Sequence, residues 1–377
     1  MMFLLSQIGG LYGRVSLITT AIALLVSLLL VLTRHRHGHF SMDHPGGVQK
    51  FHTMPTPRVG GIGIYLGLAL AWQLLDAGSA KQLLGVILLA GIPALVFGLA
   101  EDLTKRVGVL PRLLATMVSG LVACLLSGVA LNRLDVPLLD DVLIYWPVAV
   151  MVTAIAVAGV ANAINIIDGF HGLASGTVIL MLLALAALAF QAGDAPLARV
   201  CMLVAAAVGG FWLINYPWGK LFLGDGGAYF VGFALAWLAV LLPMRNPGVS
   251  PWASLMVCAY PIIEVLYSIV RRSLKGLSPG DADNHHLHSL LASQFIQRQF
   301  PNLSNGLHNA GVAPFIWCCV VVPGFAAISL HAQTGVLMLS FLATVMVYHV
   351  VYRYLATGTS LVALAAADVQ PLNDVDG

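Results

Sequence analysis

The sequence has very little charge: only 9% of its 377 residues are Asp, Glu, Lys or Arg, whereas 59% are hydrophobic. Soluble globular chains carry about 25% charged residues, and the deficit here extends over the whole length. A water-soluble enzyme, or a soluble domain with one membrane anchor, is therefore excluded. The formal net charge of +2 gives no dense basic face, so we expect no nucleic-acid partner.

Cysteine is scarce as well, and no two cysteines form a Cys-x-x-Cys pair. No acidic residue or histidine stands beside them at the spacing of metal ligands. All of them fall inside apolar runs, so we expect each to be a small hydrophobic core residue. They are Cys124, Cys201, Cys258, Cys318 and Cys319.

Long apolar runs are abundant. A helix needs about 20 mostly apolar residues to cross a bilayer, whereas a barrel strand needs only about 10 that alternate. The lengths predict an all-α integral membrane protein, a polytopic bundle of about eleven transmembrane helices. We expect them at residues 15–33, 59–75, 82–99, 113–131, 142–161, 173–191, 197–214, 228–243, 252–270, 312–330 and 336–355.

If successive loops are assigned to the two sides of the membrane in turn, most of the eighteen Lys and Arg residues fall in one of the two sets of loops. Short loops rich in Lys and Arg remain cytoplasmic. We therefore expect the N-terminus outside and the C-terminus inside. Residues 1–377 then form a single membrane-embedded domain with a cytoplasmic loop at 271–311 and a flexible cytoplasmic tail at 357–377. Most histidines also fall in the inner loops, which places the polar chemistry on the cytoplasmic face.

The segment from Asn162 to His171 joins two apolar runs. Asn162, Asn165 and Asp168 are each three residues apart, so in a helix their oxygen atoms lie on one face. A simple Asn cap and Asp-Gly turn is the alternative, but it does not explain why polar residues begin before the apolar run ends.

Asp225 lies in the glycine-rich segment Phe222–Gly227, which precedes another run. It is either an N-cap of the following helix or a ligand for a hard cation such as Mg²⁺, which prefers oxygen atoms. Because the asparagine-rich loop is predicted on the same face, the sequence favours a metal site.

Two adjacent acids, Glu101 and Asp102, end the third run. Their repulsion raises one pKa, which suits a general base or a residue that supports a metal ligand. Arg112 begins the next run and is placed to bind a phosphate through two hydrogen bonds. Solvated loop charge is a sufficient explanation for the neighbouring Lys105 and Arg106.

The loop at 271–311 contains His285, His286 and His288. Adjacent histidines tend to point apart and no cysteine accompanies them, so contact with a diphosphate is favoured over zinc. Apolar residues at helical spacing follow, and they predict an amphipathic helix that lies on the membrane or covers the bundle.

Lys50, His52 and Arg58 precede the second run, in a segment with two prolines and the pair Gly60-Gly61. Proline stiffens this approach and the glycines allow close helix packing. We regard the three basic residues as candidates for substrate binding.

In order along the chain, these segments resemble the polyprenyl-phosphate N-acetylhexosamine-1-phosphate transferase family (bacterial glycosyltransferase family 4) over roughly residues 43–291. The resemblance is carried by Pro-Thr-Pro-Arg-x-Gly-Gly, Asn-x-x-Asn-x-x-Asp-Gly and Phe-Leu-Gly-Asp-x-Gly. Family members move a sugar 1-phosphate from a UDP-sugar to a lipid phosphate and release UMP. The resemblance implies UDP-N-acetylhexosamine and undecaprenyl phosphate as substrates, Mg²⁺ (or Mn²⁺) as cofactor, and a bacterial inner membrane; a homodimer is left open.

By position, the resemblance implies Asn165 and Asp225 as metal ligands, with Asp168 supporting them. Because Glu101 replaces the first residue of the family's aspartate pair, we assign the base role to Asp102. The implied substrate-binding residues are Lys50, His52, Arg58, Arg112, Asn162, His171, His286 and His288.

Three departures from the family pattern affect the choice of branch. His171 replaces a frequent aspartate, Ser289 stands where many members have histidine, and a His-His-His run is absent. We therefore favour the branch that starts O-antigen or other surface polysaccharides over the phospho-N-acetylmuramoyl-pentapeptide transferase of peptidoglycan synthesis.

A transporter or flippase is the alternative from a different class. It would carry charged residues near the middle of its spans, facing a pathway. Here the charged residues gather at the inner ends, and only Glu264 and His349 partly fit a transporter.

Overall fold

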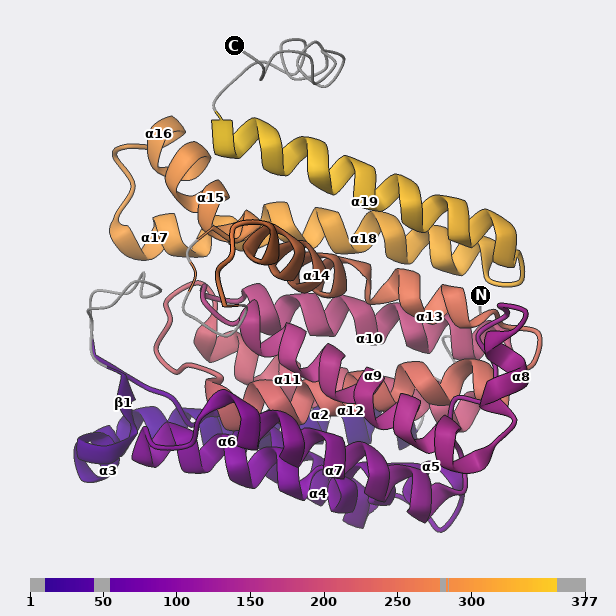
Figure 1. Ribbon diagram of the computed structural model, residues 1–377. Helices are drawn as coiled ribbons and strands as arrows, with labels where there is room; N and C mark the ends of the chain where they lie inside the picture. The colour runs from indigo at the N-terminus through magenta and orange to yellow at the C-terminus, as the bar shows by residue number, and fades with distance from the viewer. Residues whose placement is uncertain (1–10, 44–54, 279–282, 284, 358–377) are drawn as a thin grey trace, which may run out of the picture.

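The computed structural model describes residues 11–43, 55–278, 283 and 285–357 (Figure 1). Lys50, His52 and the predicted tail beyond residue 357 lie outside these ranges. The first described elements are α2 (Leu11–Leu32), α3 (Arg34–Ser41), β1 (Met42–Asp43), β2 (Thr56–Pro57), α4 (Gly60–Leu74), α5 (Ser79–Ala90), α6 (Ile92–Thr104), α7 (Val109–Ser127), α8 (Leu139–Leu143), α9 (Trp146–Ile166) and α10 (Leu173–Gln191). They are followed by α11 (Ala195–Asn215), α12 (Gly224–Arg245), α13 (Pro251–Val257), α14 (Ala259–Leu274), α15 (Leu287–Leu290), the π-helical turn η1 (Leu291–Ile296), α16 (Gln297–Gln299), α17 (Asn305–Ala310), α18 (Val312–Leu330) and α19 (Thr334–Thr357).

The chain forms an all-α membrane bundle, as the sequence predicted. Within the described ranges, eight helices are long and apolar enough to cross a membrane alone. Two more of the predicted runs form bent helix pairs, and the run at 59–75 forms the shorter apolar helix α4. Each predicted run thus corresponds to one helix or one bent pair.

The two bends correct the expectation of single runs at 82–99 and 252–270. Helices α5 and α6 meet at an angle of 41°, and α13 and α14 at 77°. A proline follows each break, Pro93 after Gly91 and Pro261 after Cys258. Because proline has no N–H group, the helical hydrogen bonds cannot continue unbroken across these points.

Helix α12 forms the centre of the bundle and is buried along almost its whole length. It contacts α4, α6, α7, α9, α10, α11 and α13, whose helices run beside it in Figure 1. A helix that is apolar on all sides must be enclosed by others, and α12 has this composition between its two ends. Its first turn is therefore held in a fixed place.

Glycines bring two neighbours into backbone contact with the first turn of α12. A Cβ atom on Gly98 of α6 would lie 2.5 Å from the Cα atom of Gly226, and one on Gly61 of α4 would lie 2.5 Å from that of Gly227. No side chain fits at either contact. The ends of α4 and α6 consequently meet the start of α12.

The cysteines follow the sequence prediction only in part. Cys124, Cys201 and Cys258 are buried, but Cys318 and Cys319 are exposed on α18. In a membrane span an apolar position can face lipid as well as the core, and composition does not distinguish the two environments.

The predicted amphipathic helix corresponds to the continuous helical segment formed by α15, η1 and α16. Leu287, Leu291 and Ile296 are buried on one side of it. The segment contacts α18 and α19, so of the two predicted arrangements it covers the bundle.

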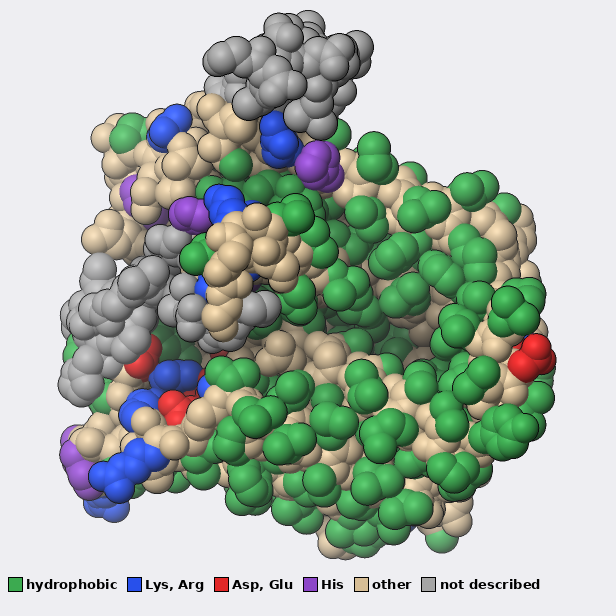
Figure 2. Space-filling view, viewed as in Figure 1, with side chains coloured by type: hydrophobic (Ala, Val, Ile, Leu, Met, Phe, Trp, Pro, Cys, Tyr) green, Lys and Arg blue, Asp and Glu red, His purple; other side chains and the backbone are tan. Residues whose placement is uncertain are grey.

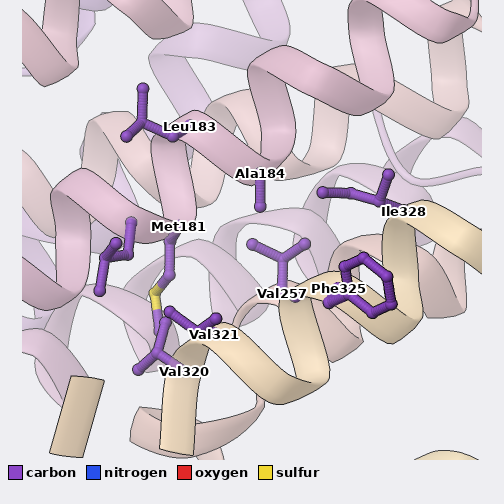
Figure 3. A pocket seen from close by; sticks show the side chains of 10 residues that line it. Met181, Leu183, Ala184, Val257, Val320, Val321, Phe325 and Ile328 are labelled. Atoms are coloured by element: carbon purple, nitrogen blue, oxygen red, sulfur yellow. The ribbon is translucent and has the colours of Figure 1, made fainter. Parts of the chain in front are cut away.

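Two of the pockets between the helices, in the part of the chain that the structure describes, are apolar. The first, of about 230 Å³, lies between α10, α13 and α18 and is lined by side chains such as Met181, Val257 and Phe325 (Figure 3). The second, of about 290 Å³, lies between α9, α12 and the α13–α14 bend. Neither is lined by a charged residue, so the candidate site lies elsewhere.

The glycine contact gives a stability prediction. Gly98→Ala should lower the apparent melting temperature in detergent, because overpacking of a filled contact costs about 1–3 kcal/mol. Gly159→Ala on α9 is the matched control, since a Cβ atom there would meet nothing within 4 Å. Equal melting temperatures for the two variants would contradict the close packing of α6 on α12.

Candidate functional site

The charged residues gather at one end of the bundle. In Figure 2 the Lys, Arg, Asp and Glu side chains lie mainly at the left, whereas hydrophobic side chains cover most of the remaining face. The segment around β2, the end of α6, the start of α7, the end of α9 and the start of α12 meet here. These are the segments that carry the sequence motifs.

Asp102 binds the start of α12. Its side chain is 0% exposed, and its two carboxylate oxygens accept hydrogen bonds from the N–H groups of Asp225 and Gly226, each at 2.9 Å. The first N–H groups of a helix have no partner within the helix and carry partial positive charge. Asp102 therefore caps α12 from 123 residues away.

Gly224 makes this approach possible. It has φ +75°, and a Cβ atom there would lie 2.3 Å from the carbonyl oxygen of Arg58 and 2.6 Å from Oδ2 of Asp102. A residue with a side chain would be strained in this conformation and would clash. Gly224 is thus required both by its positive φ angle and by the lack of room for a Cβ atom.

Asp225 is held by cationic and amide groups from three elements. Arg58 Nη2 lies 3.0 Å from its Oδ1, Arg112 Nη1 pairs with its Oδ2, and Asn165 Nδ2 donates to Oδ1 at 3.0 Å. Asp225 is the second residue of α12, whose N-cap is Leu223, so the N-cap alternative is not what the structure shows. The structure therefore brings Asn165 and Asp225 together, as the metal-site hypothesis requires.

Backbone hydrogen bonds place Arg58 beside Asp225. The N–H of Phe222 donates to the carbonyl of Pro57 at 2.8 Å, and that of Gly60 donates to the carbonyl of Phe222 at 3.0 Å. The Pro-Thr-Pro-Arg and Phe-Leu-Gly-Asp motifs are therefore joined directly. The Arg58 guanidinium also lies 3.5 Å from Asp102 and 3.8 Å from Asp43.

Tyr229 is a member of the site that sequence reasoning missed. Its ring lies 5.7 Å from the Arg112 guanidinium, and its hydroxyl donates to Oδ1 of Asn162 at 3.2 Å. Tyr229 follows Asp225 by four residues, which places both on one helix face. This four-residue spacing could have predicted Tyr229 as a member of the site.

The two remaining acids have separate surroundings. Burial raises the pKa of Asp168 to about 7, although the Arg58 charge and the Gly224 amide act to lower it. Asp168 thus lies close enough to sense the charge of Arg58. Glu101 instead accepts a hydrogen bond from the N–H of Val107 at 2.7 Å and fixes the turn after α6.

His171 connects two turns. Its Nδ1 lies 2.9 Å from the carbonyl of Pro217, and its backbone N–H donates to Oδ1 of Asn309 at 2.6 Å. The side chain is buried. These contacts give His171 a structural role, and its predicted contact with substrate stays a prediction.

His286 and His288 are buried, and His288 lies against the turn that follows Asp168. The ring of His288 meets the ring of Phe170 edge-on, with 5.6 Å between centroids, and Phe170 belongs to the turn that follows Asp168. The histidine pair therefore borders that turn. Its predicted contact with a diphosphate also stays a prediction.

The donor set fits Mg²⁺ better than a metal that needs an all-protein cage. Mg²⁺ is usually held by one or two carboxylates, with water and substrate phosphate completing its shell. Asp225 and Asn165 meet at one point, where Asn165 donates its Nδ2 amide to Oδ1 of Asp225, so the carboxamide oxygen would have to turn toward a bound ion. In the described part of the chain no three His, Cys, Asp or Glu side chains form a group that could hold a metal.

Comparison with known proteins finds similarity to one family. The family model of glycosyl transferase family 4 matches residues 84–243, which contain Asp102, Asn165 and Asp225. A Bacillus subtilis (strain 168) protein named probable undecaprenyl-phosphate N-acetylglucosaminyl 1-phosphate transferase is 27% identical over 73% of this chain and 78% of its own length.

Two further relatives are named undecaprenyl-phosphate alpha-N-acetylglucosaminyl 1-phosphate transferase. The Yersinia pestis protein is 28% identical over 68% of this chain and 71% of its own length. The Escherichia coli (strain K12) protein is 26% identical over 74% of this chain and 77% of its own length.

An all-helical bundle with a cluster of ion-paired side chains at one end defines the chain as a polytopic membrane protein. Its motifs and relatives then indicate a resemblance to glycosyl transferase family 4, whose model matches residues 84–243, and to proteins named undecaprenyl-phosphate N-acetylglucosaminyl 1-phosphate transferases.

The two adjacent acids should differ in their effect on stability. Asp102→Ala leaves two buried N–H groups without their acceptor, and each costs about 1–3 kcal/mol. Glu101→Ala removes one bond at a half-buried position and should cost less. Melting temperatures in detergent measure both, and equal losses would contradict the capping of α12 by Asp102.

Proposed function

We propose that this protein transfers an N-acetylhexosamine 1-phosphate from a UDP-sugar to undecaprenyl phosphate, releases UMP and so starts O-antigen or another surface polysaccharide. The observation that carries the proposal is the convergence of Asp225 and Asn165 with Arg58 and Arg112. The names of the relatives support undecaprenyl phosphate and an N-acetylglucosaminyl 1-phosphate group as the chemistry. The charge bias of the loops supports a cytoplasmic location for this end.

The arginines supply what a phosphoryl transfer between two anions needs most. Such a reaction requires neutralisation of charge and positioning more than covalent help. The side chains of Arg58 and Arg112 are 24% and 12% exposed, so their charges act in a partly dehydrated environment where attraction is stronger. Each guanidinium can bind phosphate oxygens through two hydrogen bonds.

Asp225 and Asn165 are the residues that would hold Mg²⁺, or Mn²⁺ in its place. When bound, the cation would neutralise the diphosphate of the UDP-sugar. Both Asp225 oxygens contact Arg58, Arg112 or Asn165, so the same carboxylate keeps the cationic groups aimed at one point.

Asp102 acts in this proposal by orientation. A lipid phosphate is already an ionised nucleophile at neutral pH, so removal of a proton is not a demanding step. Both oxygens of Asp102 accept bonds from α12, and they thereby fix the position of Asp225. Asp168, whose pKa is influenced by the charge of Arg58, contributes further negative charge when it is ionised.

The residues that favoured a transporter have specific partners. Glu264 faces His286 at 3.0 Å, and Nδ1 of His349 lies 3.1 Å from the hydroxyl of Tyr267. A transport pathway would need such groups to line an open passage. Their side-chain pairing favours the enzyme.

A direct assay tests the proposal. Purified protein is incubated with UDP-N-acetylglucosamine, undecaprenyl phosphate and either Mg²⁺ or EDTA, and UMP is measured. We expect UMP release with Mg²⁺, its loss with EDTA and its recovery when Mg²⁺ or Mn²⁺ is restored. Absence of UMP across a panel of UDP-sugars would overturn the proposed function.

Asp225→Asn should abolish turnover, by about 10³-fold or more, because it removes the carboxylate that carries the electrostatic arrangement. The variant should still fold, since α12 is capped by Asp102. The matched control is Asp76→Asn, an exposed acid at the α4–α5 turn. Full activity of a folded Asp225→Asn protein would remove Asp225 from the metal site.

A further inference from the structure

Glu264 is a buried acid that the proposed chemistry does not yet use. Its side chain on α14 is 1% exposed. Oε1 accepts a hydrogen bond from the N–H of Leu287 at 3.1 Å and lies 3.0 Å from Nδ1 of His286. Oε2 lies 3.9 Å from Nδ1 of His288 and, among the described residues, has no hydrogen-bond partner. A buried carboxylate is costly unless nearby groups stabilise its charge.

The two imidazoles that face Glu264 form an ordered pair. Their rings are nearly parallel, with 9° between planes and 5.2 Å between centroids. Both Nδ1 atoms face the carboxylate, so both Nε2 atoms lie on the far side of the rings. No group in the described ranges hydrogen-bonds to either Nε2 atom.

The surroundings hold this pair from two helices. The Tyr260 hydroxyl on α14 lies 3.3 Å from Nδ1 of His288, and the Tyr352 hydroxyl on α19 donates to the carbonyl of His285 at 3.0 Å. Asp283, which pairs with Arg271, accepts a hydrogen bond from the N–H of His285 at 3.0 Å. The acids whose charge His288 senses are therefore Glu264 and Asp283.

The hydrogen bond at Nδ1 decides what Nε2 can do. Burial lowers the pKa of His288 to about 4, although Glu264 and Asp283 act to raise it, so this ring is neutral near pH 7. At His286 the carboxylate of Glu264 lies 3.0 Å from Nδ1 and selects the form that carries its proton there. At His288 the hydrogen-bond partner of Nδ1 is the Tyr260 hydroxyl, and Glu264 acts through its charge from 3.9 Å. A neutral ring with its proton on Nδ1 has only an acceptor at Nε2, so it can donate to an anion there only after it takes up a second proton. The nearby Glu264 carboxylate offsets the positive charge of that form.

We propose that Glu264 is the positioning residue for His286 and His288, and that it aims both Nε2 atoms at the diphosphate of the sugar nucleotide and balances their charge. This inference rests on the proposed function, because that function supplies the diphosphate. It assigns Glu264 no contact with the reacting atoms.

Kinetics of Glu264→Gln test the inference, because this variant keeps the size of the side chain and removes its charge. We expect KM for UDP-N-acetylglucosamine to rise about tenfold, by analogy with the smallest effects of losing a partner that orients a metal-bound histidine. The KM for undecaprenyl phosphate should stay unchanged. Asp76→Asn is the matched control, and unchanged KM values for both substrates would overturn the inference.

A double-mutant cycle separates positioning from general damage. His288→Ala should raise the same KM. The rise in KM of the double variant should be smaller than the product of the rises in the two single variants. Independent, multiplicative effects would contradict action of Glu264 through His288. If Glu264→Gln does not fold, Glu264→Asp, which draws the carboxylate away from both rings, should raise the same KM, and an unchanged KM would overturn the inference.

A measurement without turnover distinguishes this inference from the proposed function. In protein labelled with ¹⁵N at histidine, the signals lost in His286→Ala and His288→Ala identify the two rings. We expect both to carry a proton on Nδ1, and this preference to weaken in Glu264→Gln. Protonation on Nε2 alone in the unaltered protein would overturn the positioning role even if UMP release is observed. Absence of UMP release would instead overturn the proposed function.

Discussion

The capping of α12 by Asp102 is the interaction on which the arrangement of the site depends. It joins the end of α6 to the start of the most buried helix and uses the backbone N–H group of Asp225 itself. Because Asp102 holds that N–H group, the backbone of Asp225 has a fixed position, and the side chain extends from there toward its partners. The glycines that let α4 and α6 reach the α12 backbone allow this contact to form.

The charges around Asp225 balance one another within a small volume. Arg58 contacts the carboxylates of Asp43, Asp102 and Asp225. Arg112 contacts the other carboxylate oxygen of Asp225. Buried ion pairs seldom stabilise a fold overall, because dehydration of the charges offsets their attraction. The effect of these ion pairs is to fix geometry, because each charged side chain is held in the position where it meets its partner.

Much of the fold was predictable because hydrophobic length determines where a membrane helix forms. The bends were not predicted, since a proline near a helix break is also compatible with a straight span. Cys318 and Cys319 show a second limit, because lipid and protein core are equally apolar. The identity of the candidate site came from motif chemistry, which placed Asn165, Arg112 and Asp225 on one face.

The pairing within the site could not be predicted from the sequence. Arg58 and Asp225 are 167 residues apart, and no local pattern reveals that backbone hydrogen bonds between Pro57 and Phe222 place them together. The partner of Glu264 was hidden for the same reason, although a lone acid in an apolar run already indicated a specific environment. Tyr229 could have been found from its helical spacing to Asp225.

The central position of α12 also has a consequence for a protein that works in bilayers of varying thickness. A mismatch between helix length and hydrocarbon thickness is relieved by tilting the helices that touch lipid. On this bundle those are peripheral helices such as α2 and α19, of which little is buried, whereas α12 is enclosed by its neighbours. Elastic deformation of the membrane is thus absorbed at the perimeter, away from the helix that carries Asp225.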